Sequence, residues 1–64
     1  MIFNVVFTYG DKYYQVVQQK YKASSQDTLV EYFRNKGYDK CSPNRLAKYS
    51  TQINIYPEII DIGQ

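Results

Sequence analysis

The sequence predicts a small α+β domain in which one helix packs on one face of a mainly antiparallel sheet. Three observations lead to this prediction. A capped helix pattern occupies residues 24–37, strand-forming residues fill the segments on both sides of it, and 64 residues suffice for one domain, 1–64. The expected element order is ββα(α)β, with three or four strands. Since only one helix is available, the apolar side chains of the strands must pack against it or stay exposed.

The first 22 residues predict a β-hairpin. Residues 2–9 are β-branched and aromatic, and Gly10-Asp11 fits a two-residue type II′ turn, because glycine tolerates positive φ. This turn pairs Tyr9 with Lys12. The face toward the helix would then carry Phe3, Val5, Phe7, Tyr14, Val16, Lys20 and Lys22. The opposite, open face would carry Tyr13, Val17 and Tyr21 among Thr, Asn and Gln. A longer loop would shift the register by one residue and exchange the faces.

Residues 24–37 carry the start and stop signals of a helix. Either Ser24 or Ser25 can serve as the N-cap, since a hydroxyl accepts a hydrogen bond from a free N–H of the first turn. Leu29, Val30 and Phe33 form one apolar stripe. Gly37 is the expected left-handed residue after the helix, and Tyr38 beyond it can touch Phe33. The helix is therefore expected to cover the core.

The segment 38–50 allows two interpretations. Ser42-Pro43 resembles an N-cap followed by proline at the first helical position, which predicts a short helical turn anchored by Leu46. An irregular loop is the alternative.

Residues 51–56 alternate in polarity and predict a third strand. Ile53 and Ile55 would face the helix, whereas Gln52, Asn54 and Tyr56 would extend the open face. Pro57 indicates an edge strand, a bulge or a strand end, because proline cannot donate to a ladder. Residues 58–62 could form a further short strand.

The composition argues against catalysis. There is no histidine, the commonest general base, and Cys41 is the single cysteine, so neither an internal disulfide nor a structural zinc site is expected. We expect no enzyme activity, no catalytic residue, and neither a metal nor another cofactor. The start of the chain lacks a basic segment before its apolar run, and that run is too short to span a membrane. These features predict a cytoplasmic protein without a membrane partner.

Binding is the better-supported activity. Eight tyrosines in 64 residues suit recognition surfaces, because the ring is apolar and its tip is polar. The uncovered sheet face provides the candidate partner-binding residues Tyr13, Val17, Tyr21, Asn54 and Tyr56. The first hypothesis is a larger protein partner. The alternatives are nucleic acid, whose bases stack on aromatic rings, and a homodimer in which two open faces cover each other.

A basic segment after the helix supplies the candidate site for nucleic acid or an acidic partner. Between residues 34 and 48 five basic side chains stand against Asp39 alone, a net charge of +4. Together with nearby aromatic residues, the candidates are Arg34, Lys36, Tyr38, Lys40, Arg45, Lys48 and Tyr49. No named nucleic-acid-binding motif accompanies them.

Three stretches give the chain a resemblance to small orphan proteins of Gram-positive phages and prophages. They are Tyr-Gly-Asp-Lys-Tyr-Tyr at 9–14, Tyr-Lys-Ala-Ser-Ser at 21–25, and Ile-Tyr-Pro-Glu-Ile-Ile-Asp-Ile-Gly at 55–63. Such proteins include host-takeover factors and inhibitors of bacterial defence, among them anti-CRISPR proteins. The resemblance implies a partner such as a nuclease or a nucleoprotein complex in the bacterial cytoplasm. Many of these inhibitors are acidic DNA mimics, whereas this chain is slightly basic, and no functional residue carries over.

Overall fold

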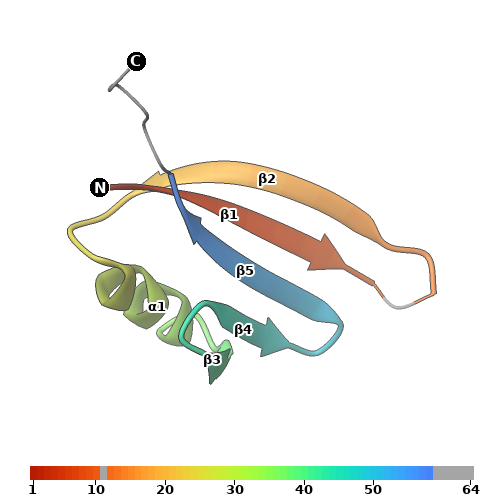
Figure 1. Cartoon of the computed structure of the whole chain (residues 1–64). Helices are drawn as coiled ribbons and strands as arrows, with labels where there is room; N and C mark the ends of the chain where they lie inside the picture. Colours follow the sequence, from red (N-terminus) through yellow and green to blue (C-terminus); the bar gives the residue numbers. More distant parts are fainter. Residues whose placement is uncertain (11, 59–64) are drawn as a thin grey trace, which may run out of the picture.

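The computed structural model describes residues 1–10 and 12–58, which form a five-stranded antiparallel sheet and one helix (Figure 1). The elements are β1 (Ile2–Tyr9), β2 (Gln15–Lys22), α1 (Gln26–Arg34), β3 (Asp39–Ser42), β4 (Arg45–Lys48) and β5 (Thr51–Pro57). Their order across the sheet is β2-β1-β5-β4-β3, so the first and last strands pair with each other. The predicted α+β class is confirmed, and the sheet has more strands than the three or four expected.

The connection between β1 and β2 is longer than the two-residue turn that was predicted. Residues 10–14 join the strands, and the Tyr13 carbonyl oxygen lies so close over Gly10 that a Cβ there would be 2.5 Å away. Gly10 has a φ of 93°, which glycine adopts without strain. As a result Tyr9 pairs with Gln15 instead of Lys12. The partner of Tyr9 thus moves by an odd number of residues, from Lys12 to Gln15. Because neighbouring residues of a strand point to opposite faces, every side chain of β2 lies on the face opposite to the one predicted.

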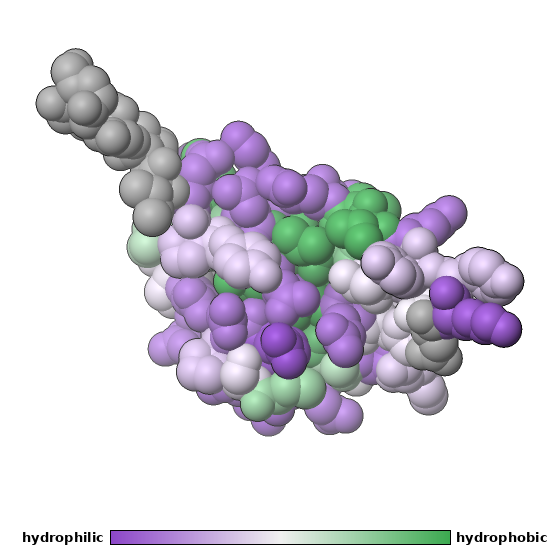
Figure 2. Space-filling model, turned by 45° about the vertical axis from the view of Figure 1, so that its right-hand side comes forward, coloured by the Kyte–Doolittle hydropathy of each residue, from purple (hydrophilic) through white to green (hydrophobic). Residues whose placement is uncertain are grey.

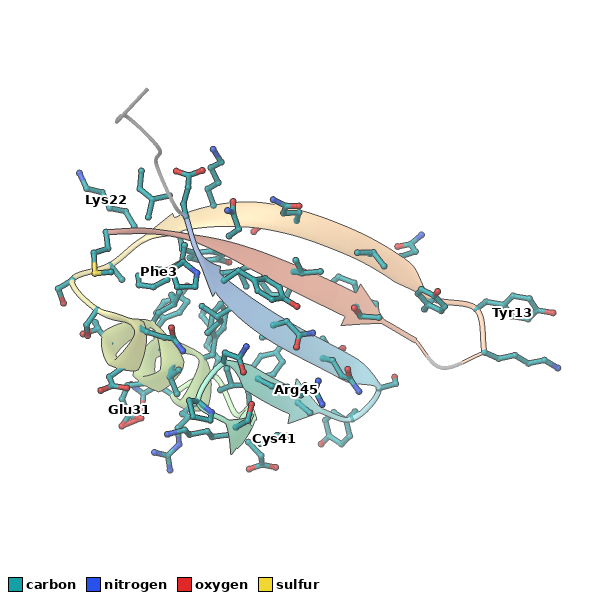
Figure 3. The ribbon with its side chains drawn as sticks, viewed as in Figure 1. Phe3, Tyr13, Lys22, Glu31, Cys41 and Arg45 are labelled. Carbon is teal, nitrogen blue, oxygen red and sulfur yellow. The ribbon has the colours of Figure 1, made fainter. Side chains whose placement is uncertain are left out.

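The exchange corrects the predicted faces of the second strand. Val16, Lys20 and Lys22, which were expected toward the helix, lie on the open face, and Figure 3 shows Lys22 pointing away from α1. Val17 and Tyr21, which were expected on the open face, lie on the helix side. Tyr13 and Tyr14 belong to the connection and not to either strand.

Helix α1 follows the prediction closely. The Ser25 hydroxyl is the N-cap and accepts a hydrogen bond of 3.2 Å from the Thr28 N–H. The stripe that faces the sheet is buried and consists of Leu29, Val30 and Phe33. After the helix Gly37 has a φ of 98°, and the Tyr38 N–H donates to the Phe33 carbonyl at 3.2 Å. The cap therefore turns the chain back toward the sheet.

The segment 38–50 is a β-hairpin, so the predicted helical turn was wrong. Pro43 and Asn44 form the turn between β3 and β4, and β4 continues into β5 through a second tight turn. Pairing with β5 gives the backbone of β4 its hydrogen-bond partners, and the Asn44 carbonyl also accepts from the Ile55 N–H at 2.8 Å. Leu46 is the anchor of this segment, as expected: it is fully buried and pairs with Ile53.

One hydrophobic core fills the space between the sheet and α1. Phe3 lies in this layer in Figure 3. The buried side chains are Phe3, Val5, Phe7, Leu29, Val30, Phe33, Leu46, Ile53 and Ile55. The predicted facing of Ile53 and Ile55 is confirmed, and Pro57 ends β5. The further strand predicted at 58–62 falls, beyond Glu58, outside the described residues. The sheet's other face has no covering element within the described chain.

Candidate interaction surface

The open face of the sheet is mainly polar. The pairing of the strands places on it Ile2, Asn4, Val6, Thr8, Val16, Gln18, Lys20, Lys22, Arg45, Ala47, Gln52, Asn54 and Tyr56. Three amide side chains there are already engaged, since Gln18 Nε2 donates to Asn4 Oδ1 and Arg45 Nε donates to Asn54 Oδ1, both at 3.3 Å. Figure 2 shows how hydrophilic side chains surround smaller hydrophobic areas on the face turned toward the viewer. Tyr56 is the one aromatic side chain among these strand residues, and Tyr14 and Tyr49 from the adjoining connections line a groove with Thr8, Ala47 and Gln52.

The five predicted partner-binding residues do not come together. Asn54 and Tyr56 lie on the open face, whereas Val17 and Tyr21 lie on the helix side. Tyr13 is 88% exposed at the far end of the β1–β2 connection, where Figure 3 shows it remote from α1. The expected array of tyrosines on the open face is therefore absent from the described structure.

The tyrosines gather instead around Phe33 on the helix side. The ring centroid of this buried side chain lies 5.4 Å from that of Tyr21, 5.2 Å from that of Tyr32 and 6.0 Å from that of Tyr38. All three pairs are edge-to-face, which is a favoured geometry for aromatic rings. The core thus holds tyrosines from β2, α1 and the segment after α1 in fixed orientations.

Strand β1 extends this cluster. The rings of Phe7 and Tyr9 are stacked at 6.0 Å, and Phe7 also lies 6.3 Å from Tyr21. Partial burial, and next the proximity of Tyr32, Tyr9 and Tyr38, raise the pKa of the Tyr21 hydroxyl above its ordinary value. Tyr21 therefore lies at the centre of this group of tyrosines.

Two lysines border the clustered rings. Lys36 Nζ lies 4.9 Å from the centre of the Tyr32 ring, and Lys48 Nζ lies 5.7 Å from that of Tyr38 and 6.0 Å from that of Tyr49. Lys48 Nζ also donates to the Lys36 carbonyl at 3.2 Å, which ties the two lysine-bearing segments together. Within the described chain neither lysine forms a salt bridge. We name this region the tyrosine surface; it consists of Tyr9, Tyr21, Tyr32, Tyr38, Tyr49, Lys36 and Lys48.

The predicted basic segment is divided among three places. Lys36, Tyr38, Lys48 and Tyr49 belong to the tyrosine surface. Arg34 pairs with Glu31 at 3.1 Å and lines a groove of about 300 Å³ together with Asp27, Val30, Glu31 and Lys40. Arg45 lies on the open face. The structure therefore joins four of the seven candidates and separates the other three.

Tyr49 occupies an unusual backbone position. It begins the tight turn between Lys48 and Thr51, which pair with each other, and its φ is 55°. Glycine, asparagine and aspartate favour such positions, whereas a bulky residue there is strained. The side chain is 97% exposed and lines a groove of about 230 Å³ with Tyr14 and with Thr8, Ala47 and Gln52 of the open face. Tyr49 therefore lies at the border between the tyrosine surface and the open face.

Several residues of this region were missed from the sequence. Tyr9, Tyr14 and Tyr32 were not among the predicted contacts. The spacing of Tyr32 and Lys36 is a usable signal, because residues four apart share one side of a helix. Tyr9 and Tyr14 carried no such signal, since their positions depend on the register and on the longer connection.

The described residues provide little for catalysis. They contain no group of three or more His, Cys, Asp or Glu placed to hold a metal ion. Cys41 is exposed, and its Sγ lies 3.8 Å from the Asp39 carbonyl oxygen. In residues 1–10 and 12–58 no helix has the length and apolar character needed to cross a membrane.

Comparison with known proteins yields no relative. No protein-family model matches the chain, and neither the curated proteins nor the solved structures contain a significant match.

Proposed function

We propose that this chain is a small non-catalytic binding protein that occupies a surface of a larger protein through its tyrosine surface. The observation that carries the proposal is the exposure of tyrosines on this surface: Tyr9, Tyr32 and Tyr49 are exposed, and no tyrosine of the described chain belongs to the buried core. Aromatic side chains provide much of the energy of protein recognition, and Tyr is enriched among the residues that dominate it.

Preorganisation supports this proposal. Tyr21, Tyr32 and Tyr38 are oriented by the buried Phe33 ring, so little side-chain entropy remains to be lost when a partner binds. Lys36 and Lys48 add positive charge without a described carboxylate in salt-bridge range. A partner with an apolar depression bordered by acidic residues would complement both features.

The narrower form of the proposal concerns the kind of partner. The resemblance to phage and prophage proteins suggests an inhibitor of a bacterial defence nuclease, in the manner of anti-CRISPR proteins, acting in the host cytoplasm. On this proposal the chain blocks a protein surface, and it does not imitate the charge of DNA, because its net charge is +2.

Affinity capture with paired variants tests the proposal. The wild-type chain and the double variant Tyr32→Ala, Tyr49→Ala are immobilised and exposed to nuclease-treated bacterial lysate, and the retained proteins are identified by mass spectrometry. Both side chains are exposed, so the variant should keep its fold. We expect the wild type to retain a protein that the variant retains about thirtyfold less strongly, since each of the two anchor rings contributes about 1 kcal/mol or more.

The matched control carries the substitutions Asn54→Ala and Tyr56→Ala on the open face. It should retain the same protein as the wild type. Equal retention by all three chains would remove the tyrosine surface from the proposal, and failure of the wild type to retain any protein would remove the proposal itself.

Single-stranded nucleic acid is the second candidate, and one observation favours it. Lys12, Lys36 and Lys48 each lie within about 6 Å of a tyrosine ring, and proteins that bind single strands combine cations with stacking rings. Lys22 and Arg45 add positive charge on the open face.

Titration of a labelled thymidine oligonucleotide distinguishes this candidate. Binding should be detectable at low salt, weaken as salt rises, and fall further in Lys36→Gln, Lys48→Gln, because each phosphate contact releases counterions. Absence of binding at low salt would eliminate it.

A further inference from the structure

Among the described residues, strand β2 is an exposed edge, and no other strand pairs with its outer side. The sheet has two edges, β2 and β3. β3 is protected, because it is four residues long, its register is irregular between Lys40 and Ser42, and Pro43 follows it. β2 is eight residues long, has a continuous register and contains no proline (Figure 1). Long regular edges of this kind are templates for another strand.

The hydrogen bonds at the end of β2 identify which backbone groups are free. The Met1 amino group donates to the Ala23 carbonyl at 2.9 Å, and the Ala23 N–H donates to the Met1 carbonyl at 3.0 Å. Antiparallel pairs alternate between bonded and non-bonded, so the odd-numbered residues of β2 bond to β1. The N–H and C=O groups that point out of the sheet belong to Val16, Gln18, Lys20 and Lys22.

We infer that β2 pairs antiparallel with β2 of a second copy of this chain, to form one continuous sheet. In the best register Gln18 of each copy lies opposite Lys20 of the other, and Val16 lies opposite Lys22. Each of the four outward-pointing residues of one strand then pairs with one such residue of the other strand. Since each pair exchanges two hydrogen bonds, the two copies form about eight. This inference does not depend on the proposed function.

Charge selects this register. Moving the strands by one step would place Lys20 opposite Lys20 of the second copy, and like charges directly opposite are destabilising. A step in the other direction would place Lys22 opposite Tyr14, which lies outside the strand. In the chosen register no lysine opposes a lysine. Lys20 Nζ is moreover 2.8 Å from Glu58 Oε1, so its charge is already compensated within the chain.

Side-chain contacts favour the same arrangement. Val16 and Val17 are exposed apolar residues on opposite faces of β2. On the helix side, Val17 of one copy would lie opposite Tyr21 of the other. Tyr21 borders a mainly apolar groove of about 310 Å³, which Lys22, Ala23, Thr28, Leu29 and Tyr32 complete. The second strand would therefore bury apolar atoms that the monomer exposes.

Such a dimer has a functional consequence. A two-fold axis perpendicular to the sheet leaves both helices, and hence both tyrosine surfaces, on one side. A partner that is itself repeated could then be bound twice, which raises the effective affinity without any new contact.

Sedimentation velocity over a concentration series tests the inference. For the wild type, the mean mass should rise from that of one chain, 7.6 kDa, toward twice that value between about 5 and about 500 µM, the range expected of a small interface. Gln18→Pro removes an outward N–H that plays no part in the β1 ladder, and it should weaken association at least about tenfold. Gln18→Ala keeps that N–H and should associate like the wild type.

A second variant guards against misfolding of the proline chain. A chain of 64 residues is accessible to chemical synthesis, so Gln18 can be replaced by its N-methyl form, which keeps the side chain. Circular dichroism checks the fold of each variant. A wild type that remains monomeric would overturn the inference. A dimer that survives N-methylation would also overturn it, because another surface would then hold the copies together.

Discussion

At the scale of single residues, Tyr49 combines a positive φ with a bulky, exposed side chain. A positive φ costs a bulky residue about 1 kcal/mol or more relative to glycine. The Tyr49 ring is almost fully exposed and contacts little besides the Lys48 ammonium group. A binding role would account for a tyrosine that the fold itself does not require.

Replacing Tyr49 by glycine should therefore stabilise the chain. We expect the free energy of unfolding in urea to rise by about 1 kcal/mol, because glycine adopts the left-handed conformation without strain. Tyr49→Ala is the matched control, since it removes the ring and keeps the strained backbone. An equal stability change in both variants would show that the effect comes from the ring and not from φ.

Tyr21 makes a second prediction, in alkaline solution. Its pKa is raised in the folded chain above the ordinary value of 10.0. As the pH rises, the Tyr21 hydroxyl of the unfolded chain therefore loses its proton before that of the folded chain. The stability that the protonated Tyr21 hydroxyl contributes is complete below pH 10.0 and is lost as the pH rises through the folded pKa.

Urea unfolding at several alkaline pH values measures this loss. Tyr21→Phe should make the stability less dependent on pH, whereas Tyr13→Phe, at an exposed position, should leave the dependence unchanged. Identical profiles for the wild type and Tyr21→Phe would contradict the prediction.

At the scale of elements, local signals predicted well and pairing signals did not. The helix was readable because Ser25, the apolar stripe and Gly37 lie within one short segment. The register of β1 and β2 could not be predicted in the same way, because it depends on how closely the Tyr13 backbone approaches Gly10. The β3–β4 hairpin was also missed: Ser42-Pro43 resembles a helix start, and only pairing with the distant β5 makes the strand.

The candidate site inherited these errors. Tyr13, Val17 and Tyr21 were assigned to the open face because a two-residue turn was assumed. The importance of tyrosine could be predicted from composition, but the assembly of Tyr21, Tyr32 and Tyr38 around Phe33 could not. That cluster joins residues from three separate segments of the chain, and their distances depend on the tertiary fold.

The helix cap offers a prediction at this scale. Ser25→Ala removes the hydroxyl that accepts from the Thr28 N–H, and it should lower the free energy of unfolding by about 1 kcal/mol. Ser24→Ala removes a hydroxyl that contacts the Thr28 side chain alone and should cost less. Urea unfolding of both variants measures which substitution lowers the free energy of unfolding more. A larger loss for Ser24→Ala would show that Ser25 is not the N-cap.

At the scale of the whole molecule, the sheet has two unlike sides, because the helix covers only one of its faces. The open face is polar, with amides already hydrogen-bonded to their neighbours. The helix side carries the clustered tyrosines and two lysines. The edge β2 runs between these sides, and pairing there would leave the open face accessible and would cover the helix side only near Tyr21.

Photo-crosslinking at two positions tests the central claim, that the tyrosine surface binds a protein partner. A benzophenone amino acid is placed at Tyr32, on the tyrosine surface, or at Tyr56, on the open face; both side chains are about half exposed. Each chain is irradiated in bacterial lysate, and the crosslinked products are identified by mass spectrometry. The account predicts one dominant protein product from position 32 and none from position 56. The reverse result, with a product from position 56 alone, would contradict it.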